Sequence, residues 1–247
     1  MLKKNIAVIF EDSRYGGPHS QFLNLAQILK KKINFKVLIS NIESSYFEKK
    51  IKKISLKYKK KKIFFLNKKI KNIINYLLKF LSDLYLIIKF VKTNESEYLY
   101  VPGGSTCIKS ILAGLIMKKK ILWHIHDVHS NIFIRLFYFF LSIFVWKIIF
   151  ASKKSYEFYP NFLVKKKITI LQSAVFKISA HKKIKKRRMK IGIVANFNPV
   201  KNIELFLRIV ELFKKEKNFS FYLIGQVWES QINYYKKCKQ LILKKKN

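Results

Sequence analysis

Cysteine, arginine and acidic residues are all scarce in this chain, and each shortage excludes a class of protein. Only two cysteines, Cys107 and Cys238, occur in 247 residues. That count argues against a disulfide framework and a cysteine-rich zinc site. The first residues, MLKKN, contain no apolar leader, so secretion is disfavoured and a cytoplasmic location is predicted.

The shortage of acid leaves a strongly basic chain, with 52 Lys plus Arg against 13 Asp plus Glu and a formal charge of +39. Such a charge attracts nucleic acids and anionic membrane surfaces. Specific phosphate and guanine recognition favours the bidentate guanidinium group, however, and only five of the basic residues are arginine. We therefore expect no nucleic-acid partner, and we interpret the lysine runs mainly as solvated ends of helices and strands.

Long uncharged apolar runs are also missing. The best candidate for a membrane span, Asn131 to Phe150, is interrupted by Arg135 and Lys147. It predicts a helix packed on a sheet, followed by a short strand from Lys147. The alternative is a helix lying in a membrane surface. Both interpretations leave the protein on one side of the membrane.

Half of the residues are hydrophobic, enough for one or two cores. Short apolar runs alternate with helical patterns, which predicts an α/β fold with a parallel sheet. The predicted strands are Asn5–Phe10, Phe35–Ser40, Lys62–Leu66, Tyr98–Val101, Ile121–Ile125 and Lys147–Ala151. The predicted helices between them are Gln21–Lys31, one long helix over Ile70–Lys92, and Thr106–Met117.

The pattern restarts after a basic stretch. We predict an N-terminal Rossmann-like domain over 1–176, a linker over 177–189 and a partial C-terminal Rossmann-like domain over 190–247. The last region offers two strands, Lys190–Ala195 and Phe219–Ile224, and two helices, Ile203–Lys215 and Ser230–Leu243. Two strands make a poorly protected parallel sheet, so this domain is expected to be incomplete.

Two glycine pairs follow predicted strands, but neither forms a known nucleotide motif. Gly16 and Gly17 lie in EDSRYGGP after the first strand, and VPGGSTC follows the fourth. No G-x-G-x-x-G or P-loop pattern is present, which disfavours a dinucleotide oxidoreductase and a P-loop NTPase. The first pair either lets the backbone approach a ligand at a helix amino terminus or forms an ordinary tight turn.

Polar side chains gather after the fifth strand, where WHIHDVHS contains His124, His126, Asp127 and His129. Ligands of open α/β sheets bind at the carboxyl ends of the strands. Alternating spacing predicts that His124 and His126 point the same way. These groups are suited either to a metal ion or to hydrogen bonds with a sugar or diphosphate.

The second region has a comparable loop, NFNPVKN, with Asn196, Asn198 and Lys201. Lys201 is expected to open a helix, where a lysine opposes the helix dipole unless an anion binds there. The alternative is a solvated lysine in a lysine-rich chain.

In their order and spacing, these segments resemble the family-4 retaining glycosyltransferases of GT-B fold. The segments that carry the resemblance are EDSRYGGP, HIHD, KKITIL, IGIVANFNPVKNIELFLRIV and FSFYLIGQV. The resemblance implies an enzyme that moves a sugar from a nucleotide-diphosphate sugar to a glycan or lipid-linked acceptor with retention. It implies no catalytic metal and no cofactor beyond the nucleotide sugar, and it is compatible with peripheral contact with an anionic membrane at its inner face.

By position, the resemblance assigns catalytic roles to His126 and Asp127. Asp127 is expected to contact the acceptor. It assigns donor binding to Gly16, Gly17, Asn196 and Lys201. Asn196 stands where the family usually has an arginine, and the family's pair of glutamates with seven residues between them is not found. The sequence therefore predicts a truncated glycosyltransferase. The alternative is a non-catalytic remnant that binds an anionic membrane surface or a partner protein.

Overall fold

The structure is a computed structural model that describes residues 3–66, 70–104, 107–126, 132–159, 168–172, 189–227 and 231–244. The chain divides into two compact units, Met1–Lys177 and Ile178–Asn247. The predicted linker, 177–189, lies outside the described residues except for its last position. We describe each unit by itself.

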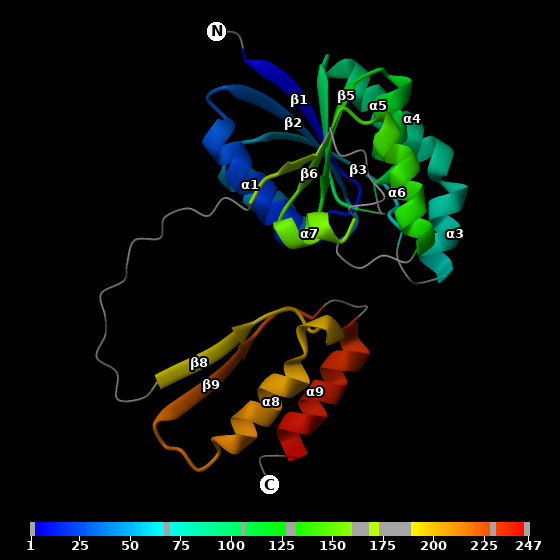
Figure 1. Cartoon of the computed structure of the whole chain (residues 1–247). Helices are drawn as coiled ribbons and strands as arrows, with labels where there is room; N and C mark the ends of the chain where they lie inside the picture. The colour runs from blue at the N-terminus through cyan, green and yellow to red at the C-terminus, as the bar shows by residue number, and fades with distance from the viewer. Residues whose placement is uncertain are drawn as a thin grey trace. The chain divides into compact units, whose positions relative to one another are not determined.

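A seven-stranded sheet forms the centre of the first unit (Figure 1), with strand order β3-β2-β1-β4-β5-β6-β7. All of these neighbouring strands are parallel, as the sequence predicts. The strands are β1 Lys4–Phe10, β2 Ile33–Ser40, β3 Lys57–Lys61, β4 Tyr98–Pro102, β5 Lys120–Ile125, β6 Lys147–Phe150 and β7 Ile168–Ile170.

Helices cover both faces of this sheet, which explains why its central strands are almost continuously apolar. Helices α1 and α2 pack on one face through a core that includes Phe22 and Phe47. Helices α4, α5 and α6 pack on the other face through a core that includes Ile87, Ile111 and Tyr138. The helices are α1 Gly17–Leu29, α2 Ser45–Lys53, α3 Ile70–Leu78, α4 Phe80–Thr93, α5 Ile108–Ile116, α6 Ile132–Phe144 and α7 Lys153–Glu157.

The third strand was predicted in the wrong place. The structure forms β3 from Lys57–Lys61, and Ile63 and Phe65 are buried just beyond its end. This strand pairs only with β2 and lies at the edge of the sheet. An edge strand tolerates exposed lysines, which also protect it against pairing with other chains, so it has no apolar signature.

The long predicted helix over 70–92 is two helices. The backbone of Lys79 departs from helical geometry, with φ −99° and ψ 6°, and separates α3 from α4. Helices α2 and α7 were not predicted, because both are short and rich in lysine.

The segment considered as a membrane span forms α6 followed by β6, as predicted, with Asn131 outside the described residues. Among the described helices, none has the length and apolar character needed to cross a bilayer.

The second unit has the predicted order of elements. Its described strands, β8 Met189–Val194 and β9 Phe219–Ile224, are parallel. Helix α8 Ile203–Leu212 follows β8, and α9 Ile232–Lys244 follows β9. A 3-10 turn, η2 Pro199–Lys201, precedes α8. A small core around Phe197, Ile203, Leu207 and Cys238 joins these elements.

A close approach of α5 to the sheet provides a test of this packing. A Cβ atom on Gly114 would lie 2.7 Å from Ile121 Cγ1 and 2.8 Å from Leu99 Cδ2. We expect Gly114→Ala to lower the free energy of unfolding by about 1–3 kcal/mol, measured by urea denaturation of the full chain. Gly17→Ala is the control, because nothing lies within 4 Å of its Cβ position. Equal losses in the two variants would contradict the assigned packing.

Candidate functional site

The carboxyl ends of β1, β4 and β5 lie side by side, because these strands are neighbours in a parallel sheet. The predicted residues Gly16, Gly17 and His126 follow β1 and β5 at this edge. Ligands of open α/β sheets bind at this edge. Asp127 and His129 lie outside the described residues, so the role predicted for Asp127 stays a prediction.

The segment Asp12–Gly17, which we call the glycine loop, is braced by an ion pair within itself. Arg14 donates from Nε to Asp12 Oδ1 at 2.9 Å and from Nη2 to Asp12 Oδ2 at 2.7 Å. The guanidinium group also lies over the ring of Phe65, 4.4 Å from its centroid. A bidentate pair of this kind fixes the geometry of a loop more strongly than a single contact does.

His19, on the first turn of α1, closes the other end of the glycine loop. Its Nδ1 accepts a hydrogen bond from the Gly16 N–H at 3.2 Å, and its Nε2 lies 2.9 Å from the Asp12 carbonyl oxygen. The proton must therefore be on Nε2, which donates to the carbonyl. Burial lowers the pKa of His19 to about 4, so the ring is neutral at pH 7. Sequence reasoning missed this residue, although it stands directly after the glycine pair in GGPH.

His124 and His126 lie against each other, as their alternating spacing predicts, with ring centroids 4.1 Å apart. The Tyr100 hydroxyl lies 2.5 Å from His124 Nδ1. Burial, helped by the neighbouring His126, lowers the pKa of His124 to about 3. Burial, helped by the neighbouring His19, lowers the pKa of His126 to about 4. Both rings are therefore neutral at pH 7. Within the described part of the chain, Nε2 of each ring is buried without a hydrogen-bond partner.

His126 is the more accessible member of this pair. His124 is completely buried, whereas His126 is half-buried just beyond the end of β5. A neutral imidazole with an unpartnered nitrogen can hydrogen-bond a hydroxyl or phosphate oxygen of a ligand. His124 is held by Tyr100 inside the sheet, so we interpret it as a structural residue and not as a ligand-binding one.

A buried charged cluster lies beneath the same edge and was not predicted. Lys109 Nζ lies 2.8 Å from Asp83 Oδ2 and 3.8 Å from Glu11 Oε2, and all three side chains are almost completely buried. Lys109 also donates to the Phe64 carbonyl oxygen and lies over the Tyr76 ring. The available signal was one lysine in an apolar helix, IKSILAGLI, together with an acid directly after a buried strand.

Glu11 is the unusual member of this cluster. Its Oε1 accepts hydrogen bonds from the backbone N–H of Ser110 at 2.8 Å and from the Ser110 hydroxyl at 2.7 Å. Its Oε2 has no hydrogen-bond partner among the residues that the structure describes. Burial raises the pKa of Glu11 to about 7, against the lowering effect of Lys109.

The described residues do not support the alternative that the histidine cluster after β5 binds a metal ion. Among them, no three His, Cys, Asp or Glu side chains are grouped so that they could hold an ion. The segment with Asp127 and His129 is outside that set, so the alternative for those residues is not tested.

The second unit presents Asn196 and Lys201 after the carboxyl end of β8. Lys201 is exposed and ends the 3-10 turn, whereas α8 begins at Ile203, so the expectation that Lys201 opens the helix is wrong. The Asn198 side chain accepts from the Val200 N–H at 3.1 Å and caps the 3-10 turn, and Asn202, which is left-handed with φ 47°, separates this turn from α8. Gly225 lies against the same loop, since a Cβ there would be 1.8 Å from the Ala195 carbonyl oxygen.

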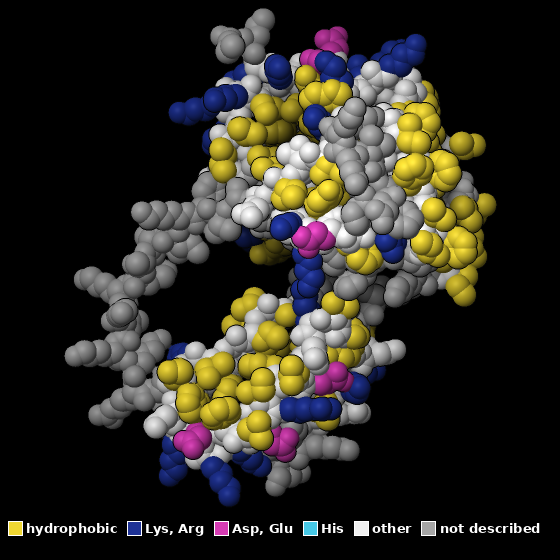
Figure 2. Space-filling model, viewed as in Figure 1, with side chains coloured by type: hydrophobic (Ala, Val, Ile, Leu, Met, Phe, Trp, Pro, Cys, Tyr) yellow, Lys and Arg dark blue, Asp and Glu magenta, His cyan; other side chains and the backbone are white. Residues whose placement is uncertain are grey.

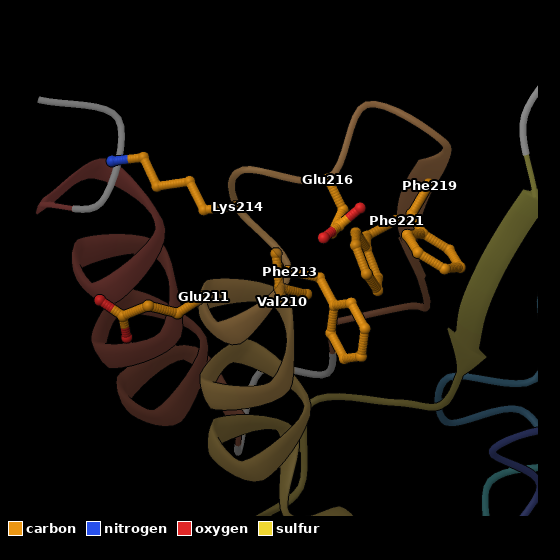
Figure 3. A pocket seen from close by; sticks show the side chains of 7 residues that line it. All are labelled: Val210, Glu211, Phe213, Lys214, Glu216, Phe219 and Phe221. Carbon is orange, nitrogen blue, oxygen red and sulfur yellow. The ribbon is translucent and has the colours of Figure 1, made fainter.

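A pocket in the second unit lies away from these loops. Its lining comes from the end of α8 and the beginning of β9, and Figure 3 shows the side chain of Lys214 extending away from the rings of Phe213 and Phe221. Its volume is about 260 Å³, below the usual range for ligand pockets. We therefore place the candidate site at the carboxyl ends of the strands and not in this pocket.

Comparison with solved structures identifies the architecture as an α/β fold of the GT-B type, with a seven-stranded parallel sheet and a second, small parallel sheet. The Anabaena protein HepE, solved with UDP-glucose, matches with a TM-score of 0.77 and 14% identity over 97% of this chain and 65% of HepE. A glycosyltransferase from Rickettsia africae matches with a TM-score of 0.66 and 15% identity over 99% of this chain and 66% of that protein.

The same fold also occurs in a different class of enzyme. The UDP-GlcNAc 2-epimerase of Neisseria meningitidis, solved with UDP-GlcNAc, matches with a TM-score of 0.57 and 15% identity over 98% of this chain and 70% of the epimerase. No family model and no curated protein sequence matches the chain. The chain spans about two thirds of the length of HepE.

The raised pKa of Glu11 predicts a pH-dependent stability. The unfolded chain loses this proton near the ordinary pKa of 4.5, whereas the folded chain keeps it until about pH 7. The free energy of unfolding therefore decreases as the pH rises through that window. In Glu11→Gln we expect this decrease to be smaller by on the order of 2–3 kcal/mol, measured by urea denaturation from about pH 5 to pH 8.

The control for this experiment is Glu97→Gln. Glu97 is exposed and paired with Lys120, and its pKa is lowered by that contact, so it should not titrate in the same window. Parallel pH profiles for Glu11→Gln and the unmodified chain would contradict the assignment.

The clamp formed by His19 predicts a local effect on the glycine loop. We expect His19→Ala to increase hydrogen–deuterium exchange at the Gly16 amide, because its acceptor is lost, and to lower the free energy of unfolding by about 2–4 kcal/mol. His19→Gln keeps one donor and one acceptor and should restore part of the protection. Unchanged exchange at Gly16 in His19→Ala would show that the clamp does not hold this loop.

Proposed function

We propose that the chain is a glycosyltransferase, or part of one, that takes a sugar from a nucleotide-diphosphate sugar. One observation carries the proposal: within a GT-B fold, the carboxyl ends of β1 and β5 bring the glycine loop and the neutral His126, whose Nε2 has no hydrogen-bond partner among the described residues, to one edge of the sheet. HepE, which shares this fold, was solved with UDP-glucose, and this supports a nucleotide sugar as the ligand.

In this proposal the second unit binds the diphosphate of the donor through Asn196 and Lys201. Lys201 is exposed at the carboxyl end of β8, where a phosphate could reach it. Negative charge develops on the diphosphate as the sugar leaves, and a cation placed there stabilises the transition state more than the ground state.

The first unit contributes the glycine loop and His126 to the proposed reaction. Gly17 is exposed at the start of α1, so the backbone of Gly16 and Gly17 can approach a sugar or phosphate oxygen closely. His126 would hydrogen-bond a hydroxyl of the transferred sugar as a neutral group, and Asp127 would contact the acceptor.

The finer parts of the proposal are transfer with retention, a glycan or lipid-linked acceptor, no catalytic metal and no additional cofactor. They are supported by the resemblance of the HIHD and NFNPVKN segments to the family-4 enzymes. Cytoplasmic action, peripheral on the inner face of a membrane, belongs to the same proposal.

A second candidate is a non-catalytic protein that binds an anionic membrane surface or a partner protein. The formal charge of +39 favours it, because a basic surface attracts anionic headgroups and acidic partners. Binding to anionic vesicles that is lost at high salt, without binding of a sugar nucleotide, would support this candidate.

The experiment is a calorimetric titration of the full chain with UDP-glucose, UDP and ADP, followed by an assay for release of UDP with added acceptors. If Lys201 contacts the diphosphate, Lys201→Ala should weaken the binding of UDP-glucose about tenfold or more, because a charged hydrogen bond contributes about 1.5–3 kcal/mol.

Lys214→Ala is the matched control for Lys201→Ala. Lys214 is also exposed, but it lines the pocket at the other end of α8. Equal effects of the two variants would remove Lys201 from the site. If none of the three nucleotides binds to the unmodified chain at millimolar concentration, the proposed function is wrong for this chain.

A further inference from the structure

Large exposed apolar side chains are concentrated on three helices of the first unit. On α3 and α4 they recur at helical spacing across the break at Lys79, and on α6 they form a second stripe of phenylalanines. The α3–α4 stripe consists of Ile70, Ile74, Leu77, Leu81 and Tyr85, and the α6 stripe consists of Phe133, Phe137, Phe140 and Phe144. Phe133 and Leu81 are each 77% exposed.

The residues of the two stripes lie on other faces of their helices than the residues that build the core. Helix α4 packs on the sheet through Ile87 and Val91, and α6 packs through Tyr138 and Leu141. Both helices therefore bury one apolar face and leave another exposed. A helix that is apolar on both sides normally has a second apolar environment to contact.

The two stripes lie on the same side of the sheet. Helices α4, α5 and α6 share one hydrophobic core on that side, and α4 packs along α5. Within α5, Ile116 alone is exposed, so the outer surface of this layer comes mainly from α3, α4 and α6. Figure 2 shows hydrophobic side chains gathered where Figure 1 places these three helices.

The charges of the same helices indicate what covers this surface. The exposed charged side chains described on α3 and α4 are all lysines: Lys71, Lys79, Lys89 and Lys92. The acid of α4, Asp83, is buried in the ion pair with Lys109. A second copy of a chain with a net charge of +39 would bring further positive charge to this surface. Anionic headgroups would neutralise the lysines while acyl chains accept the aromatic side chains.

We propose that the outer faces of α3, α4 and α6 form a surface that lies on an anionic lipid bilayer. The two apolar stripes enter the boundary between headgroups and acyl chains, and the surrounding lysines contact the headgroups. No described helix is able to cross the membrane, so the contact is peripheral. This inference deepens the membrane contact included in the proposed function, and its test is separate from that of glycosyl transfer, because lipid binding by this surface needs no nucleotide sugar.

The test is sedimentation of the full chain with vesicles of phosphatidylcholine alone or mixed with phosphatidylglycerol. A basic chain binds anionic vesicles through any face, so the decisive variants change apolar residues and leave the charge unaltered. Phe133→Ser with Phe140→Ser, or Leu77→Ser with Leu81→Ser, should each weaken binding to the anionic vesicles at least about tenfold. Their exposure means that the fold is retained, which circular dichroism checks.

The matched control is Ile28→Ser with Leu212→Ser, since these residues are 54% and 82% exposed on α1 and α8. It should bind like the unmodified chain. In a second pair, Lys79→Glu with Lys89→Glu should weaken binding to anionic vesicles at least about tenfold, whereas Lys49→Glu with Lys53→Glu on α2, which changes the net charge equally, should have a smaller effect.

Two outcomes would overturn the proposal. The phenylalanine and leucine pairs could bind anionic vesicles as tightly as the control, which would show that charge alone attracts the chain. Alternatively, the unmodified chain could sediment in solution as a dimer that these pairs dissociate, which would assign the surface to a contact between two copies.

Discussion

The buried ammonium group of Lys109 is the contact on which the architecture of the first unit depends. It lies between Asp83 of α4 and Glu11 after β1, and it also contacts the Phe64 carbonyl oxygen and the Tyr76 ring of α3. Loss of one partner would leave an uncompensated charge in the core, which is among the most destabilising changes in proteins. One side chain therefore fixes α3 and α4 against α5 and against the beginning of the glycine loop.

This anchoring has consequences at the edge of the sheet. Glu11 accepts two hydrogen bonds from Ser110, so the residue that precedes the glycine loop is held to the start of α5. The loop is then braced by the Asp12–Arg14 pair and closed by His19. His19, His124 and His126 are neutral at pH 7, because burial disfavours the imidazolium form. The candidate site is thus preorganised, and its histidines are neutral hydrogen-bonding groups at pH 7.

The two faces of the sheet differ in how they meet their surroundings. On one face, α1 and α2 cover a core of aromatic and β-branched residues. On the other, the layer of α4, α5 and α6 covers its core and still exposes apolar stripes. A site at the carboxyl edge and an apolar surface on one side would suit an enzyme whose acceptor is attached to lipid, and in that sense the two proposals support each other.

Much of the fold could be predicted from local pattern. The strands β1, β2, β4, β5 and β6, their parallel arrangement and the pairing of His124 with His126 follow from apolar runs and from the period of two along a strand. The glycine pair and the histidine cluster were singled out because they follow strands whose carboxyl ends share one edge, and the family resemblance selected Gly16, Gly17 and His126 among them. The position of β3 was missed because an edge strand needs no apolar residues, and the break at Lys79 was missed because the apolar stripe continues across it.

The sequence by itself thus determined the fold class and most strands of the sheet, since these depend on periodicity and on strand direction, and it predicts a ligand at the carboxyl edge. The tertiary structure alone decided that Lys109 joins Glu11 and Asp83, that His19 closes the glycine loop and that Glu11 holds its proton until about pH 7. It also decided which apolar stripes remain exposed. These features arise between residues far apart in the chain, because burial and partner geometry exist only after the helices have packed on the sheet.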